Sequence, residues 1–123
     1  MTRVESFIVE DSHTASHIGS GNSRVLATPW MIAYMERTCH HLLGEKLPKG
    51  YSSVGILVNI RHLAPCAVGK VVDVKAELIN INGLKVTFKV NAQCESTLIG
   101  EGFHERFVIE EERFLRKLIK PES

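Results

Sequence analysis

Apolar residues along this chain follow one long helical pattern and several strand-like patterns. The helical segment begins at Thr28, whose hydroxyl can cap free amide groups, and Pro29 suits the first turn of a helix. Every residue from Trp30 to Met35 is apolar, so no polar stripe remains to face water. This pattern predicts a helix that other elements enclose, with Gly44 as its expected end.

Alternation of apolar and polar residues predicts the first strands. A short strand is expected from Glu5 to Asp11, whereas the region from His13 to Ser23 has no periodicity and is expected to be a loop. The segment from Ser52 to Ala64 alternates clearly, and Pro65 should end it. One face of that strand is predicted to carry Val54, Ile56, Val58, Ile60 and, last in the row, His62.

Three further strands are predicted, at Lys70–Asn80, Leu84–Glu95 and Leu98–Ile109. Asn82-Gly83 is a strong signal for a hairpin between the first two of them. Gly100 and Gly102 interrupt the last strand, which suggests a bulge. The inward rows of the first two strands are expected to be Val72, Val74, Ala76 and Leu78, and then Leu84, Val86, Phe88, Val90, Ala92 and Cys94.

A second helix is predicted from Glu111 to Lys120, and its apolar residues at helical spacing are Phe114, Leu115, Leu118 and Ile119. The chain therefore reads as a strand, a long buried helix and an antiparallel meander of four strands. This order predicts an α+β fold in which an antiparallel sheet of about five strands wraps around one long buried helix. A single domain is expected over residues 1–123.

Composition narrows the classes of function. The chain has 123 residues and a formal net charge of +1, so nothing indicates a nucleic-acid or membrane-surface partner. No apolar run is long enough to span a bilayer, and the N-terminus has no signal-peptide pattern. Cys39, Cys66 and Cys94 are odd in number and unpaired by spacing, which favours reduced thiols in a cytoplasm.

Glu36 and His62 are the candidate acid–base residues. A carboxylate at the end of an apolar helical run is rare, because burial disfavours its charged form unless a partner holds it. Each residue also has an ordinary interpretation, Glu36 as a solvated residue and His62 as a satisfied core histidine. Taken together they predict a pair in which the carboxylate fixes the imidazole tautomer.

Thr28 and Gly55 could contribute to the same site. Thr28 is expected at minimum to be the N-cap of the long helix, and a helix N-terminus at a pocket offers free amides to a developing oxyanion. Gly55 is either a weak point in its strand or a place where a substrate approaches the backbone closely.

Two groups of residues suggest a metal ligand set. His13 and His17 lie four residues apart in the expected loop, and the helix contains the run Cys39-His40-His41. Neither group has convincing supporting ligands in the sequence, so we expect no metal site.

Three motifs resemble those of the hotdog-fold acyl-CoA thioesterases, and most closely the fluoroacetyl-CoA thioesterase group. They lie between Val25 and Ile109 and read Ala27-Thr28-Pro29-x-Met31-Ile32-Ala33-x-Met35-Glu36, His62-Leu63-Ala64-Pro65-x-x-x-Gly69 and His104-Glu105-Arg106-Phe107. The catalytic threonine, glutamate and histidine of that family match Thr28, Glu36 and His62. Its glycine near the reacting carbonyl matches Gly55, and its late-strand arginine matches Arg106, which implies substrate binding.

The resemblance implies a hotdog thioesterase that hydrolyses a small or medium acyl-CoA to the free acid and coenzyme A. Glu36 and His62 would carry the acid–base work, while Thr28 would orient Glu36 or attack directly. No separate cofactor is implied, because coenzyme A is part of the substrate. The resemblance also implies a homodimer, with a tetramer as a further form, in which acyl-CoA lies in the seam and Arg106 reaches toward it.

Two other functions remain as alternatives: a hotdog hydratase or dehydratase, and a non-catalytic acyl-CoA-binding module. The substrate also needs separate consideration. The family's fluoroacetyl-specific member has aromatic lid residues before the helix, whereas Gly19-Ser20-Gly21-Asn22 contains none. We therefore expect selection for fluoroacetyl-CoA to be weak.

Overall fold

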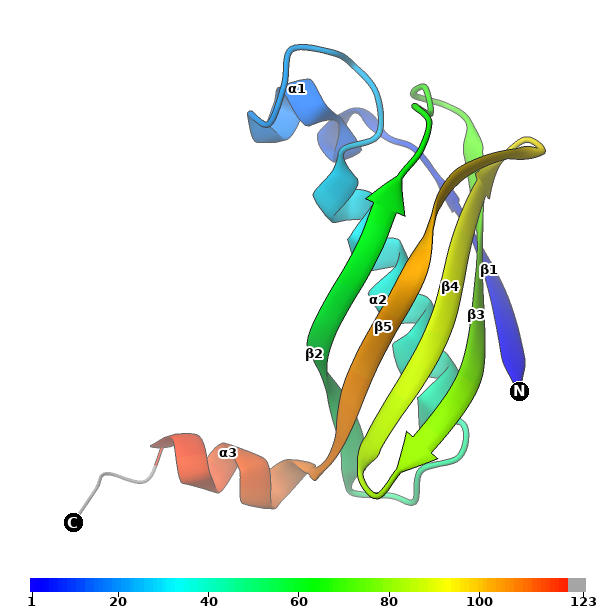
Figure 1. The fold of residues 1–123 in the computed structure, drawn as a ribbon. Coiled ribbons are helices and arrows are strands. Elements are labelled where there is room, and N and C mark those ends of the chain that lie inside the picture. Colours follow the sequence, from blue (N-terminus) through cyan, green and yellow to red (C-terminus); the bar gives the residue numbers. More distant parts are fainter. Residues whose placement is uncertain (120–123) are drawn as a thin grey trace.

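Helix α2 (Thr28–Gly44) lies across one face of a five-stranded antiparallel sheet in the computed structural model, which describes residues 1–119 (Figure 1). The strands are β1 (Thr2–Ile8), β2 (Tyr51–His62), β3 (Val71–Asn82), β4 (Lys85–Cys94) and β5 (Thr97–Glu110). The remaining helical elements are η1 (Asp11–His13), α1 (Ala15–Ile18) and α3 (Glu111–Ile119). This arrangement confirms the predicted α+β fold, with its sheet around one long helix.

The order of the strands in the sheet is β1-β3-β4-β5-β2, so the expected meander of four strands is wrong. Strands β3, β4 and β5 are consecutive neighbours, but β2 pairs with β5 and occupies an edge. Gly102 helps to explain this pairing, because a Cβ at that position would lie 2.0 Å from the carbonyl oxygen of Asn59 on β2. Only a glycine lets the two backbones approach so closely here.

The N-terminal strand lies earlier than predicted. Strand β1 pairs with β3 from Thr2 opposite Glu77 to Ile8 opposite Val71, and the ladder stops where β3 begins. The chain then forms the short helix η1, which begins at the expected end of the strand, and α1, which lies within the region that was expected to be a loop. In α1 the first turn is capped, because Thr14 Oγ1 accepts a hydrogen bond from the His17 amide.

Helix α2 begins and ends where its sequence predicted, but it buries one face rather than its whole circumference. The buried residues are Met31, Tyr34, Met35, Thr38, Cys39, Leu42 and Leu43. The opposite side, which includes Ile32 and Glu36, is only half-buried. The predicted N-cap role of Thr28 is also wrong: Ala27 is the N-cap residue, and the Thr28 side chain makes a hydrogen bond to His62 instead.

The inward rows of β3 and β4 are largely as predicted. Val72, Val74, Ala76, Val86, Phe88, Val90 and Ala92 are all buried against α2 and its neighbours. Leu84 is an exception, because it belongs to the tight turn of the hairpin after Asn82 and remains exposed. The two-residue connection at Gly83, which has a positive φ of 63°, confirms the predicted hairpin.

Strand β2 does not keep the simple alternation expected of it. Its register against β5 shifts between Gly55 and Leu57, so Ile56 is an extra residue in the ladder. Ile56 and Val58 are 50% and 44% exposed, although they were predicted to face inward. Strand β5 is continuous through Gly100 and Gly102. Its register against β4 shifts by one residue beside Gly100, because Ala92 pairs with Gly100 whereas Gln93 pairs with Leu98.

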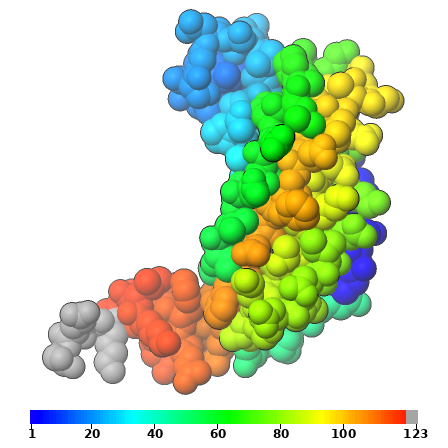
Figure 2. Space-filling model, in the orientation of Figure 1, coloured from blue at the N-terminus to red at the C-terminus, as the bar shows by residue number. Residues whose placement is uncertain are grey.

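Helix α3 extends away from the sheet on the same side as strand β2 (Figure 1). Its predicted apolar residues form no part of the core, since Leu115, Leu118 and Ile119 are exposed and only Phe114 is half-buried. Lys120, the predicted last residue of this helix, lies outside the described residues. Figure 2 shows the result: the surface is hollowed along the β2 edge, between the α1 region and α3.

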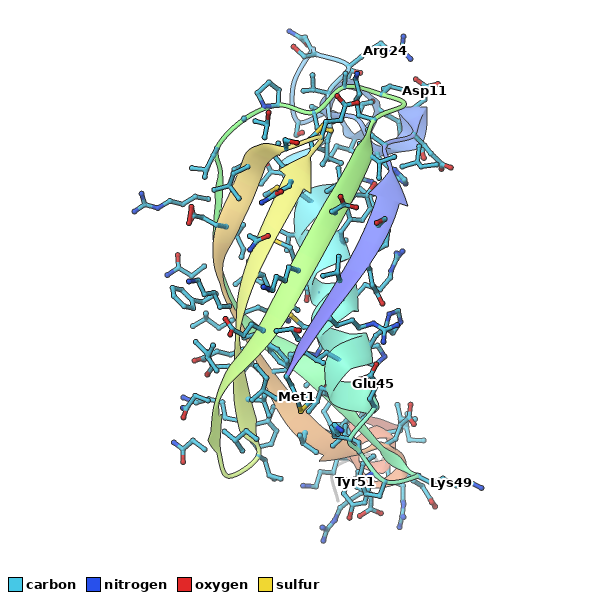
Figure 3. All side chains as sticks on the ribbon, turned by 90° about the vertical axis from the view of Figure 1, so that its right-hand side faces the viewer. Met1, Asp11, Arg24, Glu45, Lys49 and Tyr51 are labelled. Atoms are coloured by element: carbon cyan, nitrogen blue, oxygen red, sulfur yellow. The ribbon has the colours of Figure 1, made fainter. Side chains whose placement is uncertain are left out.

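Polar contacts attach the N-terminal helices to the rest of the fold. The Tyr34 hydroxyl of α2 lies 2.8 Å from His13 Nδ1, and Arg24 pairs with Asp11. In Figure 3 both Asp11 and Arg24 lie at one end of the molecule, while Lys49 and Tyr51 lie at the other.

None of the helices within residues 1–119 has the length and apolar character needed to cross a membrane.

Candidate active site

Thr28 and His62 meet at the N-terminal end of α2. Thr28 Oγ1 lies 2.7 Å from His62 Nδ1, which is a short hydrogen-bond distance between these two atoms. The other ring nitrogen, Nε2, is buried and has no hydrogen-bond partner among residues 1–119. The pair therefore has one imidazole nitrogen that is oriented by a hydroxyl and a second, buried nitrogen that no described residue satisfies.

A surface pocket of about 390 Å³ opens beside this pair. It is lined by Ala15, Ser20, Val25, Leu26, Ala27, Thr28, His62, Leu63, Ala64 and Pro65. The α1 region forms one wall and the segment after β2 forms another, so residues distant in the sequence enclose the hydroxyl–imidazole pair. The lining is mainly aliphatic, with few polar groups, as is common in small-molecule sites.

Glu36 belongs to a second cluster, around Gly55 on β2. A Cβ built on Gly55 would lie 2.8 Å from Glu36 Oε2, 3.0 Å from His104 Cε1 and 3.5 Å from Arg106 Nη1. The absence of a side chain at this one position thus lets a carboxylate from α2 approach the backbone of β2 beside two basic groups of β5. The predicted approach of a substrate to Gly55 stays a prediction, and in the structure Glu36 is the group nearest to the glycine.

Arg106 is buried, and three hydrogen bonds hold its guanidinium. Nε donates to Ser53 Oγ at 2.7 Å, Nη2 donates to the Ser53 carbonyl oxygen at 2.9 Å, and Nη1 donates to His104 Nε2 at 3.2 Å. No carboxylate lies within salt-bridge distance of it in the described part of the chain. The Glu36 carboxylate and this buried guanidinium thus lie beside the same glycine without a direct ion pair between them.

The histidine of each cluster, His62 and His104, has a lowered pKa. Burial lowers the pKa of His62, and it lowers the pKa of His104, where the Arg106 charge acts in the same direction. Both imidazoles are therefore biased toward the neutral form near pH 7. Burial also lowers the pKa of Arg106, and the charge of Glu36 opposes that shift.

The two clusters are separate within one chain. Thr28 and Glu36 are eight residues apart on α2, which corresponds to about 12 Å along the helix axis. The structure therefore does not bring Glu36 to His62 in a single chain, although we expected them to pair directly. It brings His62 to Thr28, and it brings Glu36 to Gly55 and Arg106.

Sequence reasoning missed two residues of the Glu36 cluster, Ser53 and His104. His104 was quoted in a motif, yet its motif gave no sign that the side chain faces inward. The neighbouring Phe103 and Phe107 are the more obvious core residues of β5, but they are exposed, whereas His104 and Arg106 are buried. The only available signal was that the polar residues His104 and Arg106 occupy alternate positions of the same strand.

The residues considered as metal ligands have other surroundings. His13 contacts Tyr34 and the ring of Trp30, and His41 lies 2.7 Å from Glu5. Within residues 1–119, no group of three or more His, Cys, Asp or Glu side chains is arranged to hold a metal ion.

The sequence of this chain is similar to those of known proteins. Residues 9–112 match the family model described as the fluoroacetyl-CoA-specific thioesterase, FlK. The fluoroacetyl-CoA thioesterase of Streptantibioticus cattleyicolor is 35% identical over 94 residues, which cover 76% of this chain and 68% of the relative.

Solved structures give the same result at the level of the fold. A structure of the fluoroacetyl-CoA thioesterase FlK superposes with a TM-score of 0.91 at 29% identity, covering 100% of this chain and 96% of that one. A hot-dog-like protein from Thermanaerovibrio acidaminovorans superposes with a TM-score of 0.88 at 22% identity, covering 96% of this chain and 87% of that one. At the latter identity the likeness concerns the fold alone.

Proposed function

The chain belongs to the family of fluoroacetyl-CoA-specific thioesterases, and we propose that it hydrolyses small or medium acyl-CoA thioesters to the free acid and coenzyme A. One observation carries this proposal: the Thr28 hydroxyl and the His62 imidazole lie 2.7 Å apart at a pocket of about 390 Å³. Thioester hydrolysis needs a base that can activate an oxygen nucleophile, and a neutral imidazole beside a hydroxyl supplies one.

The chemistry can follow either of two routes. In the first, His62 takes a proton from a water molecule, whose oxygen attacks the thioester carbon, and the C–S bond breaks as the departing thiolate receives the proton. In the second, Thr28 Oγ1 gives its proton to His62 Nδ1 and attacks the thioester carbon, the C–S bond breaks, and the departing thiolate receives that proton; water then hydrolyses the acyl-threonine ester to the free acid and the Thr28 hydroxyl. Mass spectrometry of the rapidly quenched protein distinguishes the routes, because only the second adds an acyl group to Thr28.

We also propose that the protein works as a homodimer in which each site takes Glu36 from a second copy. Strand β2 is an unpaired edge of 12 residues, and three consecutive residues on it, Ile56, Leu57 and Val58, are apolar and exposed. The other edge, β1, carries the charged Arg3 and Glu5, which discourage pairing. The hollow surface along β2 in Figure 2 has room for a partner.

A two-fold axis near the middle of β2 would pair this strand with its own copy in antiparallel fashion. The Gly55 region of one copy would then lie toward the His62 end of the other. Glu36 would supply the carboxylate that holds the imidazolium of His62 after proton transfer. Glu36 and His62 are far apart in one chain. Such an assembly would supply the acid–base pair that the single chain lacks. Arg106 stays inside its own chain and would act on the substrate through the Glu36 cluster.

The pocket supports a wider substrate range than fluoroacetyl-CoA. None of its lining residues is Phe, Tyr or Trp, and the wall from the α1 region consists of the small residues Ala15 and Ser20. A two-carbon acyl group would leave part of this wall uncovered.

The proposed cytoplasmic location is supported by Cys39, Cys66 and Cys94, which are free cysteines. No separate cofactor is part of the proposal.

Release of free thiol from a panel of acyl-CoA esters tests the hydrolysis directly. The panel should include acetyl-CoA, fluoroacetyl-CoA and chains of up to about eight carbons, with the uncatalysed rate measured alongside. Thiol release well above that rate, with one equivalent of acid formed, is the expected result. A hydratase would change only the acyl chain, and a binding module would leave every ester intact, so either outcome would replace this proposal.

A further inference from the structure

His104 lies between the bulge of β2 and the guanidinium of Arg106. It is 1% exposed, and its two ring nitrogens have different partners. Nδ1 lies 2.8 Å from the carbonyl oxygen of Leu57, and Nε2 lies 3.2 Å from Arg106 Nη1. The side chain therefore connects β2 to the Arg106 group from within the core.

The chemistry of these partners determines the tautomer of His104. A carbonyl oxygen can only accept a hydrogen bond, so Nδ1 must carry a proton. A guanidinium can only donate, so Nε2 must be unprotonated. His104 is thus a neutral imidazole with its proton on Nδ1, and burial, which lowers its pKa, acts in the same direction.

Both contacts of His104 act on the position of Glu36. Leu57 is the first paired residue after the bulge at Ile56, so the bond to its carbonyl holds the bulge that follows Gly55. The bond from Arg106 turns Nη1 toward the space beside Gly55, where the Glu36 carboxylate lies. Ser53 holds the other side of the guanidinium, so His104 supplies the only hydrogen bond to Nη1 among the described residues.

We infer that His104 is a positioning residue for the thioesterase site: its neutral ring orients Arg106 and the bulged β2 backbone, and through them Glu36. This inference rests on the proposed hydrolysis, and it adds a residue that does not touch the substrate. Supporting hydrogen bonds of this kind keep catalytic groups within a fraction of an ångström of their working geometry.

Two substitutions separate the contacts of His104. In His104→Asn, the side-chain amide can still donate to the Leu57 carbonyl, but it is too short to accept from Arg106. In His104→Gln, the amide oxygen can reach the position of Nε2 and accept from Arg106. Val74→Ala, in the buried row of β3, is the control for a loss of core packing at a distance from the site.

We expect His104→Asn to lower kcat by about tenfold or more with a smaller change in KM, because a displacement of reacting groups by about 1 Å is costly to turnover. His104→Gln should restore most of that loss, and Val74→Ala should lower the melting temperature without a comparable fall in kcat. In an Arg106→Gln background, His104→Asn should cause no further loss. Wild-type kcat in His104→Asn, equal losses in Asn and Gln, or a full additional loss in the double variant would each overturn the inference.

A measurement independent of turnover completes the test. Nitrogen-15 NMR of the wild-type protein at pH 7 should show His104 neutral with its proton on Nδ1, and a charged ring or the other tautomer would overturn the inference. If the wild-type protein released no thiol from any ester, the proposed function would fail. If it were active but had the wrong tautomer, only the role of His104 would fail.

Discussion

Glu36 lies against the bare backbone of Gly55: a Cβ on Gly55 would be 2.8 Å from Glu36 Oε2. Side chains do not tolerate such a distance, so any residue larger than glycine would displace the carboxylate. The same Cβ would lie 3.0 Å from His104 Cε1, which cannot move easily because the ring is held at both nitrogens. The position of Glu36 therefore depends on Gly55, because this residue of the neighbouring strand β2 has no side chain.

Gly55→Ala should lower kcat/KM by about tenfold or more, because the new methyl group moves Glu36 from its place beside Arg106. Gly44→Ala is the matched control, since no atom of residues 1–119 other than its own neighbours lies within 4 Å of a Cβ at Gly44. Steady-state kinetics with the best substrate of the panel compare the two variants. Equal activity in both would mean that the contact between Gly55 and Glu36 has no part in turnover.

The acyl pocket should select weakly for fluoroacetyl-CoA over acetyl-CoA, because its lining contains no Phe, Tyr or Trp side chain. Ser20→Phe should narrow the pocket and reduce the rates for longer acyl chains more than the rate for acetyl-CoA. Ser23→Phe places the same ring on an exposed residue outside the lining, so it should leave the chain-length profile unchanged. A strong preference of the wild-type protein for fluoroacetyl-CoA would contradict this prediction.

Stability should fall on acidification through the histidine range. Burial lowers the pKa of His40, His62 and His104, so the unfolded chain binds protons at these sites more readily than the folded chain. The contribution of these histidines to the free energy of unfolding is then greatest above the unfolded pKa of about 6.5. It declines as the pH falls below that value toward the folded pKa values. Urea unfolding at pH 8, 7, 6 and 5.5 measures this slope.

His104→Gln should flatten that dependence, whereas a substitution of the exposed His17 by Asn should not. A stability that stays constant between pH 8 and 5.5 would mean that these histidines are not held neutral in the folded protein.

The β2 edge should mediate self-association. Light scattering at micromolar concentration should give about twice the chain mass of 13.7 kDa, and activity should decline as the protein is diluted below its dissociation constant. Val58→Lys adds a charge to this edge and should shift the mass toward the monomer. Ile79→Lys alters a similarly exposed residue of β3 and should not. A monomeric wild-type protein with full activity would rule out the dimer.

The sequence predicted those features that depend on local signals. Both ends of α2 are marked by Thr28-Pro29 and Gly44, and the hairpin is marked by Asn82-Gly83, because these residues act on the backbone where they stand. The place of β2 beside β5 could not be predicted in this way. It depends on a glycine, Gly102, that allows another strand to approach, and not on any pattern within β2.

The site residues show the same division. Thr28 was predicted to cap its own helix, but its hydroxyl bonds instead to His62, which is 34 residues away and comes close only in the fold. His104 was missed because alternation in β5 fits two orientations, and the phenylalanines suggest the wrong one. Glu36 and His62 lie in separate clusters of one chain, so their predicted pairing is absent from the single chain and stays a proposal for the dimer.

The central claim is that two copies build each hydrolytic site, with His62 from one and Glu36 from the other. Glu36→Gln and His62→Ala should each lower thiol release by about a hundredfold, as expected for a positioned acid–base group. The decisive measurement mixes the two inactive variants, exchanges their subunits and follows thiol release from the best acyl-CoA. Half of the randomly formed dimers then contain one copy of each variant, and each of these has one intact site, so roughly a quarter of wild-type activity should return. If the mixture stays as inactive as its components while light scattering confirms dimers, the two residues do not meet across the dimer, and the account is contradicted.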